Sequence, residues 1–130
     1  MIFIDSNIPM YLVGNHDGQR QAAQRLLERA ALAMRPLATS AEVYQEILHR
    51  YTAIKRPEAI GHAFEALSAL ADHVLPVTFD DVVRAREILQ AYPLSARDAL
   101  HVAVMEAAGI EEIMTFDKGF DEVPTVRRVI

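Results

Sequence analysis

The chain has 130 residues, a formal net charge of −5 and no cysteine. A chain of this length is expected to form one domain, residues 1–130, with a hydrophobic core of its own. The lack of cysteine excludes disulfides, thiolate catalysis and cysteine-ligated metal sites. The acidic balance excludes a dominant basic surface for nucleic acid, so a phosphate-containing substrate would need a bound cation.

The sequence shows no sign of export or membrane insertion. No apolar run reaches the roughly 18 residues that a transmembrane helix needs. The opening apolar segment lacks the basic flank and the cleavage site of a signal peptide. We therefore expect a cytoplasmic protein without a membrane partner.

Strand and helix patterns alternate along the chain. Apolar and β-branched runs predict strands at residues 1–4, 73–79, 111–116 and 126–130, with a brief apolar stretch at 36–38. Helix-forming residues and apolar residues at helical spacing predict helices at 19–34, 39–51, 57–71, 80–92 and 95–109. Pro76 indicates an edge strand or an irregularity, and Gly109 fits a C-terminal helix cap. The alternation predicts an α/β fold with a mainly parallel sheet, in which ligands bind at the carboxyl ends of the strands.

Two predicted strands stop at an aspartate. Asp5 follows the first strand in FID, and Asp117 follows a later strand in TFD. Each also has a local explanation, since Asp5 precedes turn-forming residues and Asp117 precedes Lys118 and Gly119. A parallel sheet could nevertheless bring the two strand ends side by side.

Two further acidic residues lie in predicted helices. Glu42 has a structural explanation, because Thr39 and Glu42 match a T-x-x-E capping box, whereas Glu46, one turn further on, has none. Asp98 lies three residues after Ser95, so it also fits a first-turn capping position. A cap and a metal ligand need not exclude one another.

Converging carboxylates favour a bound cation. Two unit charges about 4 Å apart repel by ~4 kcal/mol at an effective dielectric constant near 20. Oxygen ligands without sulfur select Mg²⁺ or Mn²⁺, and such ions can activate water for phosphodiester hydrolysis.

Four segments together resemble the acidic motifs of the PIN domain, in order and spacing. These are FIDSN at 3–7, TSAEVYQEIL at 39–48, SARDALHVA at 95–103 and TFDKGFD at 115–121. The whole chain is similar to the VapC toxins of bacterial type II toxin–antitoxin systems. The resemblance implies a PIN-like three-layer α/β/α domain with a central mainly parallel sheet. It also implies a Mg²⁺- or Mn²⁺-dependent endoribonuclease that cleaves RNA, binds a cognate VapB-like antitoxin and forms a homodimer.

The resemblance assigns the site residues position by position. The acidic residues that it implies for catalysis and metal binding are Asp5, Glu46, Asp98 and Asp117, of which Asp5 and Asp98 are the firmest metal ligands. The residues that it implies for support through hydrogen bonds are Ser6, Asn7, Ser40 and Thr115. Gly119 and Phe120 stand where many relatives have a second acidic residue, so a fifth carboxylate at Asp121 is not carried over.

Other polar residues have simpler interpretations. Asp80 and Asp81 open a helix and are expected to be structural. No two of the five histidines have the i, i+4 spacing of a helical zinc site, so we expect surface or internally satisfied side chains, with His101 as a possible substrate contact.

Arg97 and Lys118 flank proposed site carboxylates, which favours contacts with RNA phosphates or simple exposure to solvent. Two other functions remain open at this stage. One is a catalytically inactive PIN-fold interaction module, which would be expected to have lost a carboxylate. The other is a phospho-acceptor receiver domain, which would need an acidic pair after the first strand.

Overall fold

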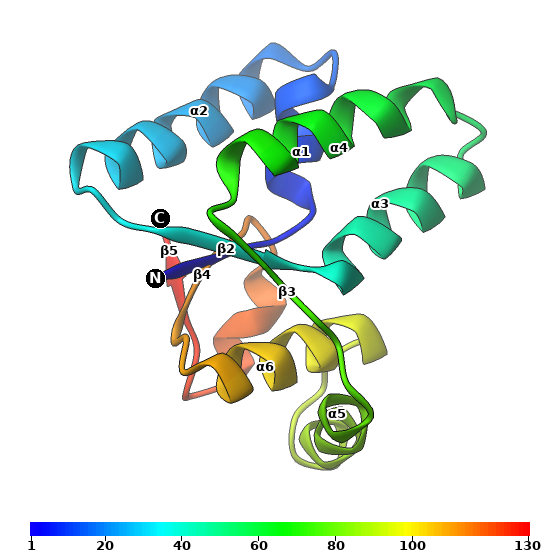
Figure 1. Ribbon diagram of the computed structural model, residues 1–130, viewed down its shortest axis with the longest axis vertical. Coiled ribbons are helices and arrows are strands. Elements are labelled where there is room, and N and C mark those ends of the chain that lie inside the picture. The colour runs from blue at the N-terminus through cyan, green and yellow to red at the C-terminus, as the bar shows by residue number, and fades with distance from the viewer.

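A five-stranded sheet forms the centre of the protein, with the strand order β3-β2-β1-β4-β5 (Figure 1). The computed structural model describes all residues from 1 to 130. The strands are β1 (Ile2–Ile4), β2 (Leu37–Ser40), β3 (His73–Leu75), β4 (Glu112–Met114) and β5 (Arg127–Val129). Every neighbouring pair is parallel, which confirms the predicted α/β fold. All three residues of β1 are buried, as expected for a central strand that is covered on both faces.

Helices cover both faces of the sheet. They are α1 (Asn7–Val13), α2 (Asp17–Leu32), α3 (Ala41–Ala53), α4 (Glu58–Leu70), α5 (Phe79–Ala91), α6 (Ala96–Ala108) and the 3₁₀ helix η1 (Lys118–Glu122). In Figure 1, α1, α2 and α4 lie above the sheet, α5 and α6 lie below it, and α3 continues from the carboxyl end of β2. The result is the predicted three-layer arrangement. None of these helices has the length and apolar character to cross a membrane.

The strand order changes direction at β1. From β1 the chain first adds β2 and β3 on one side, and later adds β4 and β5 on the other. Ile4 of β1 pairs with Met114 of β4, and the amide of Asp5 donates to the carbonyl of Met114 at 3.1 Å. The ends of the FID and TFD segments are therefore adjacent, as the parallel-sheet argument predicted. Asp5 stands at the switch point, where open α/β sheets bind ligands.

The sequence analysis missed helix α1 and recognised only part of strand β2. Helix α1 spans only seven residues and has Pro9 in its first turn, where the missing amide hydrogen costs little. So short a segment gives no clear apolar periodicity. Residues 37–40 form the fully buried strand β2, of which only a brief apolar stretch was recognised.

The predicted capping box at Thr39 and Glu42 is wrong. Thr39 still belongs to β2, pairs with Val74 and donates through Oγ1 to the carbonyl of Ile4 at 3.2 Å. Ser40 is the N-cap of α3 instead and accepts the amide hydrogen of Val43 at 3.4 Å. The sheet register thus moves the helix start one residue along the chain.

Other local predictions are confirmed. Asp81 is structural, because its side chain and that of Thr78 form a reciprocal capping box at the start of α5. Gly109 adopts a left-handed backbone conformation (φ 71°) that caps α6. β3 is an edge strand, as Pro76 indicated, but it ends at Leu75 and not at the predicted Phe79, which begins α5.

Candidate metal centre

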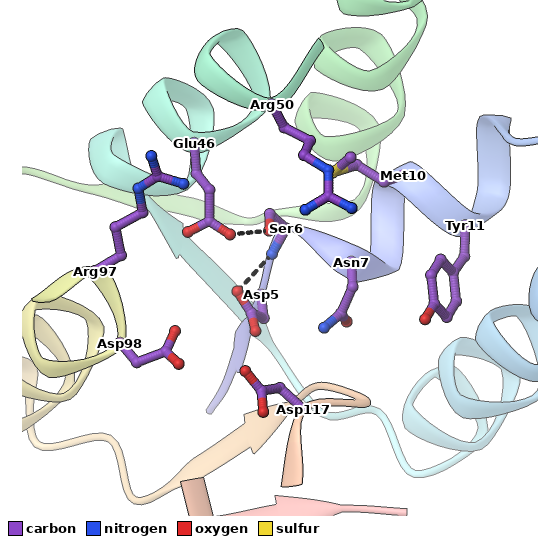
Figure 2. Close-up of a pocket in the computed structure, with 10 residues that line it drawn as sticks. All are labelled: Asp5, Ser6, Asn7, Met10, Tyr11, Glu46, Arg50, Arg97, Asp98 and Asp117. Carbon is purple, nitrogen blue, oxygen red and sulfur yellow. Dashed lines mark hydrogen bonds between the residues drawn. The ribbon is translucent and has the colours of Figure 1, made fainter. Parts of the chain in front are cut away.

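A cleft of about 250 Å³ opens at the carboxyl edge of the sheet. Ten residues line it: Asp5, Ser6, Asn7, Met10, Tyr11, Glu46, Arg50, Arg97, Asp98 and Asp117. Figure 2 shows the four carboxylates pointing into the same space from four different elements. The fold therefore brings together all four acidic residues that were selected from the sequence.

Asp5 is held in place by residues that follow the ends of two strands. The residue is only 3% exposed. Oδ1 accepts the amide hydrogen of Ser6 at 2.7 Å, and Oδ2 accepts the hydroxyl hydrogen of Thr115 at 2.7 Å. Thr115 Oγ1 in turn accepts from Asn7 Nδ2 and from the amide of Asp117, each at 3.0 Å. This network links the ends of β1 and β4 and fixes the orientation of the Asp5 carboxylate.

Glu46 reaches the cleft from the second turn of α3. The Ser6 hydroxyl donates to its Oε1, and Oε2 lies 3.0 Å from Nε2 of His101. Ser40 lies outside the residues that line the cleft, and its hydroxyl oxygen caps α3. It contributes by fixing the start of the helix that carries Glu46.

Asp98 and Asp117 combine capping positions with access to the cleft. The amide of Asp98 donates to Ser95 Oγ at 3.1 Å, and its carboxylate extends from the first turn of α6 into the cleft (Figure 2). Asp117 is the N-cap of η1, and its Oδ1 accepts the amide hydrogen of Gly119 at 2.8 Å. Asp121 is absent from the cleft lining and pairs with Arg128 at 2.8 Å.

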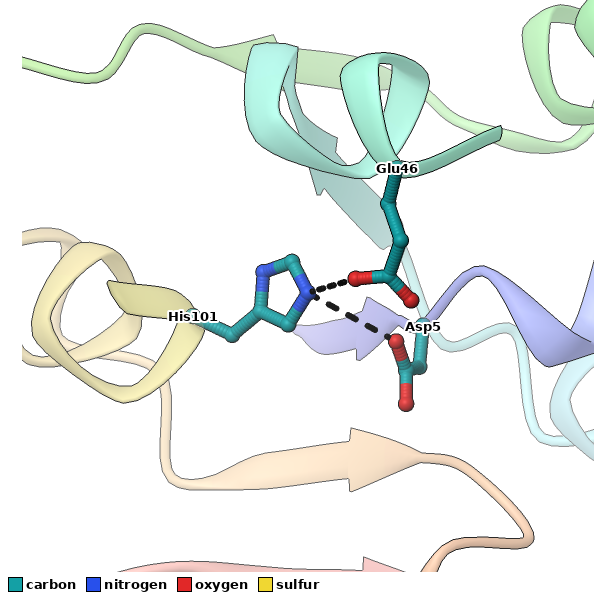
Figure 3. A group of neighbouring side chains, drawn as sticks. All are labelled: Asp5, Glu46 and His101. Carbon is teal, nitrogen blue, oxygen red and sulfur yellow. Dashed lines mark hydrogen bonds and ion pairs between the residues drawn. The ribbon is translucent and has the colours of Figure 1, made fainter. Parts of the chain in front are cut away.

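His101 is a buried neighbour of the site that the sequence analysis underestimated. Its side chain is 0% exposed, so it cannot touch substrate as the protein stands. Nε2 lies 3.0 Å from Glu46 Oε2 and 3.7 Å from Asp5 Oδ1, as Figure 3 shows. The three side chains offer atoms within 4.8 Å of one another. The sequence feature that could have identified His101 is its position one turn after Asp98, on the same side of α6.

Two arginines lie beside the acidic cluster. Arg97 and Lys118 were each expected either to contact RNA phosphates or to be exposed to solvent; Arg97 lines the cleft and Lys118 does not. Arg50 also lines it and was missed, although it lies one helical turn after Glu46. Tyr11 completes one end of the cleft and stacks on Phe116, with ring centroids 5.0 Å apart. The cleft is therefore acidic at its centre and has cationic and aromatic groups at its sides.

Burial and mutual repulsion perturb the acidic groups. Burial raises the pKa of Asp98 to about 7, with further contributions from the charges of Asp5 and Asp117. Burial and the Glu46 charge hold the pKa of Asp5 above its usual range, against the opposing effect of His101. Burial alone would raise the pKa of Glu46, but hydrogen bonds from His101 and Ser6 outweigh it and lower the pKa.

Burial would similarly lower the pKa of His101. The hydrogen bond with Glu46 and the charges of Asp5 and Glu46 more than compensate, and the pKa is raised. A histidine with a raised pKa next to carboxylates with perturbed pKa values indicates a cluster under strong negative potential.

The donor set fits a hard divalent cation. The four converging side chains offer carboxylate oxygens only, which suits Mg²⁺ or Mn²⁺. Burial is the largest cause of the raised pKa of Asp98, and repulsion by the negative charges of Asp5 and Asp117 adds to it. A bound divalent ion would relieve that repulsion.

Comparison with known proteins agrees with this geometry. Residues 2–126 match the family model described as the PIN domain. The chain belongs to the PIN domain family. Its relatives in the family include VapC ribonuclease Mb1869c from Mycobacterium bovis and Ribonuclease VapC13 from Mycobacterium tuberculosis, both 54% identical over 130 residues and 99% of each chain. The resemblance to VapC proteins that the four motifs predicted is thereby confirmed.

Solved structures of VapC and VapBC proteins share the fold. Mycobacterium tuberculosis VapC20, described as a sarcin-ricin loop cleaving toxin, is 27% identical, with a TM-score of 0.76 over 95% of both chains. VapBC2 from Rickettsia felis, solved bound to a DNA fragment from its promoter, has a TM-score of 0.73 over 98% of this chain and 97% of that chain. Its 16% identity supports the fold alone.

Proposed function

We propose that this chain is a Mg²⁺- or Mn²⁺-dependent endoribonuclease, the toxin component of a VapBC-type toxin–antitoxin system, and that it acts in the cytoplasm. The observation that carries the proposal is the convergence of Asp5, Glu46, Asp98 and Asp117 in one cleft at the switch point of the sheet. The names of the 54% identical relatives, both of which are called ribonucleases, support the same activity.

The four carboxylates have different proposed roles. Asp5 and Asp98 hold the cation, because both lie on rigid element ends and face the cleft from opposite sides (Figure 2). Glu46 and Asp117 complete its shell or orient the attacking water. When bound, Mg²⁺ or Mn²⁺ would lower the pKa of water and neutralise phosphate charge.

The arginines are the proposed contacts for the RNA backbone. Arg50 and Arg97 line the cleft beside the carboxylates, at positions where phosphates on either side of the scissile bond can lie. Planar guanidinium groups bind phosphate oxygens through two parallel hydrogen bonds. Local arginines and a bound cation thus allow a chain with a net charge of −5 to bind RNA.

The alternative, a catalytically inactive PIN-fold interaction module, is not favoured. A module without catalysis has no need for four repelling carboxylates in one cleft. The protein nevertheless retains all four, with an Asp98 pKa raised to about 7. The hydrogen bonds that orient Asp5 and Glu46 are also intact.

The proposed protein partners are a VapB-like antitoxin and a second copy of the chain. Complexes named VapBC share this fold, among them VapBC-1 from nontypeable Haemophilus influenzae, with a TM-score of 0.69. Large apolar side chains remain exposed on α3, just after its C-terminal end and on α5, and are available for these contacts; they include Leu48, Ile54, Phe79 and Val82.

Growth and RNA integrity after induced expression test the function. We expect the wild-type chain to arrest growth and to produce discrete RNA fragments that depend on Mg²⁺ in a purified reaction. Asp5→Asn keeps the size of the side chain but removes its charge, so this variant should neither arrest growth nor produce RNA fragments. Asp121→Asn is the matched control, since Asp121 lies outside the cleft, and it should behave as the wild type.

The outcome that refutes the proposal is equally direct. If the wild-type protein is folded by circular dichroism, leaves RNA intact with Mg²⁺ and Mn²⁺, and does not differ from Asp5→Asn in growth, the chain is not a ribonuclease toxin. Sequencing the ends of the fragments in the positive case identifies the RNA target and the cleavage position.

A further inference from the structure

His101 has an asymmetric environment. Nε2 points toward Glu46 and Asp5, at 3.0 and 3.7 Å from their nearest oxygens (Figure 3). Nδ1, at the opposite side of the ring, is buried and has no hydrogen-bond partner. The ring packs near Phe3, with centroids 5.6 Å apart. One ring nitrogen therefore faces the carboxylates, and the other lies in the core.

The same geometry is compatible with two roles, which differ in the ring nitrogen that carries the proton. His101 could use the lone pair of Nε2 to bind the cation, or it could use an Nε2 hydrogen to bind the carboxylates. The first role requires the proton on Nδ1, since a neutral imidazole carries only one. Metal-binding histidines almost always donate that second hydrogen to a carboxylate, a carbonyl or water.

The surroundings of the two ring nitrogens decide between the roles. An ionised carboxylate can only accept, so the 3.0 Å contact between Nε2 and Glu46 Oε2 needs a hydrogen on Nε2. A proton on Nδ1 of the neutral ring would be a buried donor without an acceptor, which is rarely tolerated in folded proteins. A proton on Nε2 instead forms a hydrogen bond of ordinary length with Glu46 Oε2.

We propose that His101 is a positioning residue that donates from Nε2 to Glu46 and leaves the metal centre with oxygen ligands alone. The inference rests on the proposed metal-dependent function of the same cleft. Ser6 binds Oε1 and His101 binds Oε2, so each oxygen of Glu46 receives one hydrogen bond. The two bonds hold the plane of the carboxylate and stop the long side chain from rotating into solvent. One lone pair of each oxygen stays free for the cation or for water.

Side-chain ¹⁵N NMR of the wild-type protein tests the proton position directly. The signals of protonated and bare imidazole nitrogens are well separated, and the spectrum of His101→Gln identifies the His101 signals by their loss. We expect a proton on Nε2 in the metal-free protein and the same proton after saturation with Mg²⁺. A bare Nε2 without metal, or transfer of the proton from Nε2 to Nδ1 when Mg²⁺ is added, overturns the proposal.

Two variants measure the consequence for the metal centre. His101→Gln places an amide N–H close to the position of Nε2, whereas His101→Leu keeps the volume without a donor. We expect His101→Leu to weaken Mg²⁺ binding, measured by calorimetry, and to lower kcat by about 10- to 100-fold, the usual effect of losing a group that orients a ligand. His101→Gln should restore most of both values.

The competing outcomes are distinct. If His101 is itself a ligand, neither variant restores Mg²⁺ binding. If His101 only fills space, both variants bind Mg²⁺ and cleave RNA as the wild type does, provided that urea unfolding shows them to be folded. Either result overturns the proposal. If the wild type binds Mg²⁺ with Nε2 protonated but cleaves no RNA, the proposed function fails while the role of His101 in the metal centre stands.

Discussion

Asp98→Asn is expected to stabilise the metal-free protein at pH 8 while it removes Mg²⁺-dependent cleavage. Burial and the charges of Asp5 and Asp117 raise the pKa of Asp98 to about 7 from its ordinary value of 3.8. Between these two values the folded protein keeps a proton that the unfolded chain has lost. The free energy of unfolding therefore falls as the pH rises through this window, and asparagine removes that effect.

The size of the effect follows from the shift. A rise from 3.8 to about 7 is roughly three pKa units, or ~4 kcal/mol at about 1.4 kcal/mol per unit. Because the carboxylate is partly open to solvent, screening reduces this upper bound to about 1–2 kcal/mol. We expect the variant to come close to the wild type near pH 4, where the folded protein keeps the proton and the unfolded chain has only begun to lose it, and to exceed the wild type by that amount at pH 8.

Urea unfolding in EDTA at pH 4, 6 and 8 measures this difference, and saturating Mg²⁺ should reverse it at pH 8. The reversal is expected because a ligand that binds only the folded state adds about 1.4 kcal/mol per tenfold excess over its Kd. Asp80→Asn is the matched control, since Asp80 is an exposed first-turn carboxylate on α5. A variant that is less stable than the wild type at pH 8 without metal, or a difference that does not change with pH, would refute the reasoning.

Three further predictions concern groups around the same carboxylates. Thr115→Val removes the hydrogen bond to Asp5 Oδ2, so calorimetry should show Mg²⁺ affinity reduced by about 10- to 100-fold while the fold is retained by circular dichroism. Arg97→Ala should raise KM for RNA and flatten the salt dependence of binding, because it removes one phosphate contact, and unchanged KM and salt slope would contradict this. The affinity for Mg²⁺ should rise from pH 6 to pH 8, because binding requires the ionised form of Asp98, whose pKa is about 7 in the metal-free protein. Binding should therefore release protons, and calorimetry in two buffers of different ionisation enthalpy measures that release.

Local patterns predicted most of the fold. Apolar runs and caps located β1, β4 and the long helices, because a buried strand or an amphipathic helix needs only its own residues to be recognised. The capping box at Thr39 was wrong, because pairing with β3 keeps that residue in the sheet. Helix α1 was missed, since its seven residues are too few for a periodic pattern and its stability depends on packing against α2 and α4.

The sequence likewise identified some residues of the candidate site and missed others. Asp5, Glu46, Asp98 and Asp117 were identified from the order and spacing of the four motifs, and Glu46 also from its lack of a capping role; the fold brings all four to one cleft. His101 and Arg50 were not assigned to the site, since each is one polar residue on a helix until its neighbours are known.

The sequence by itself determined the chemistry that is available here. A chain without cysteine, with aspartates at two strand ends and an acidic residue in each of two helices, offers carboxylate oxygens to a hard cation and no thiolate. Only the tertiary structure decided how those groups are held and charged. The pairing of β1 with β4 joins Asp5 to Thr115, and the packing of α3 near α6 places Glu46 against His101. Hydrogen-bond partners and pKa values depend on distances between residues far apart in the chain, and these distances exist only after the sheet has formed.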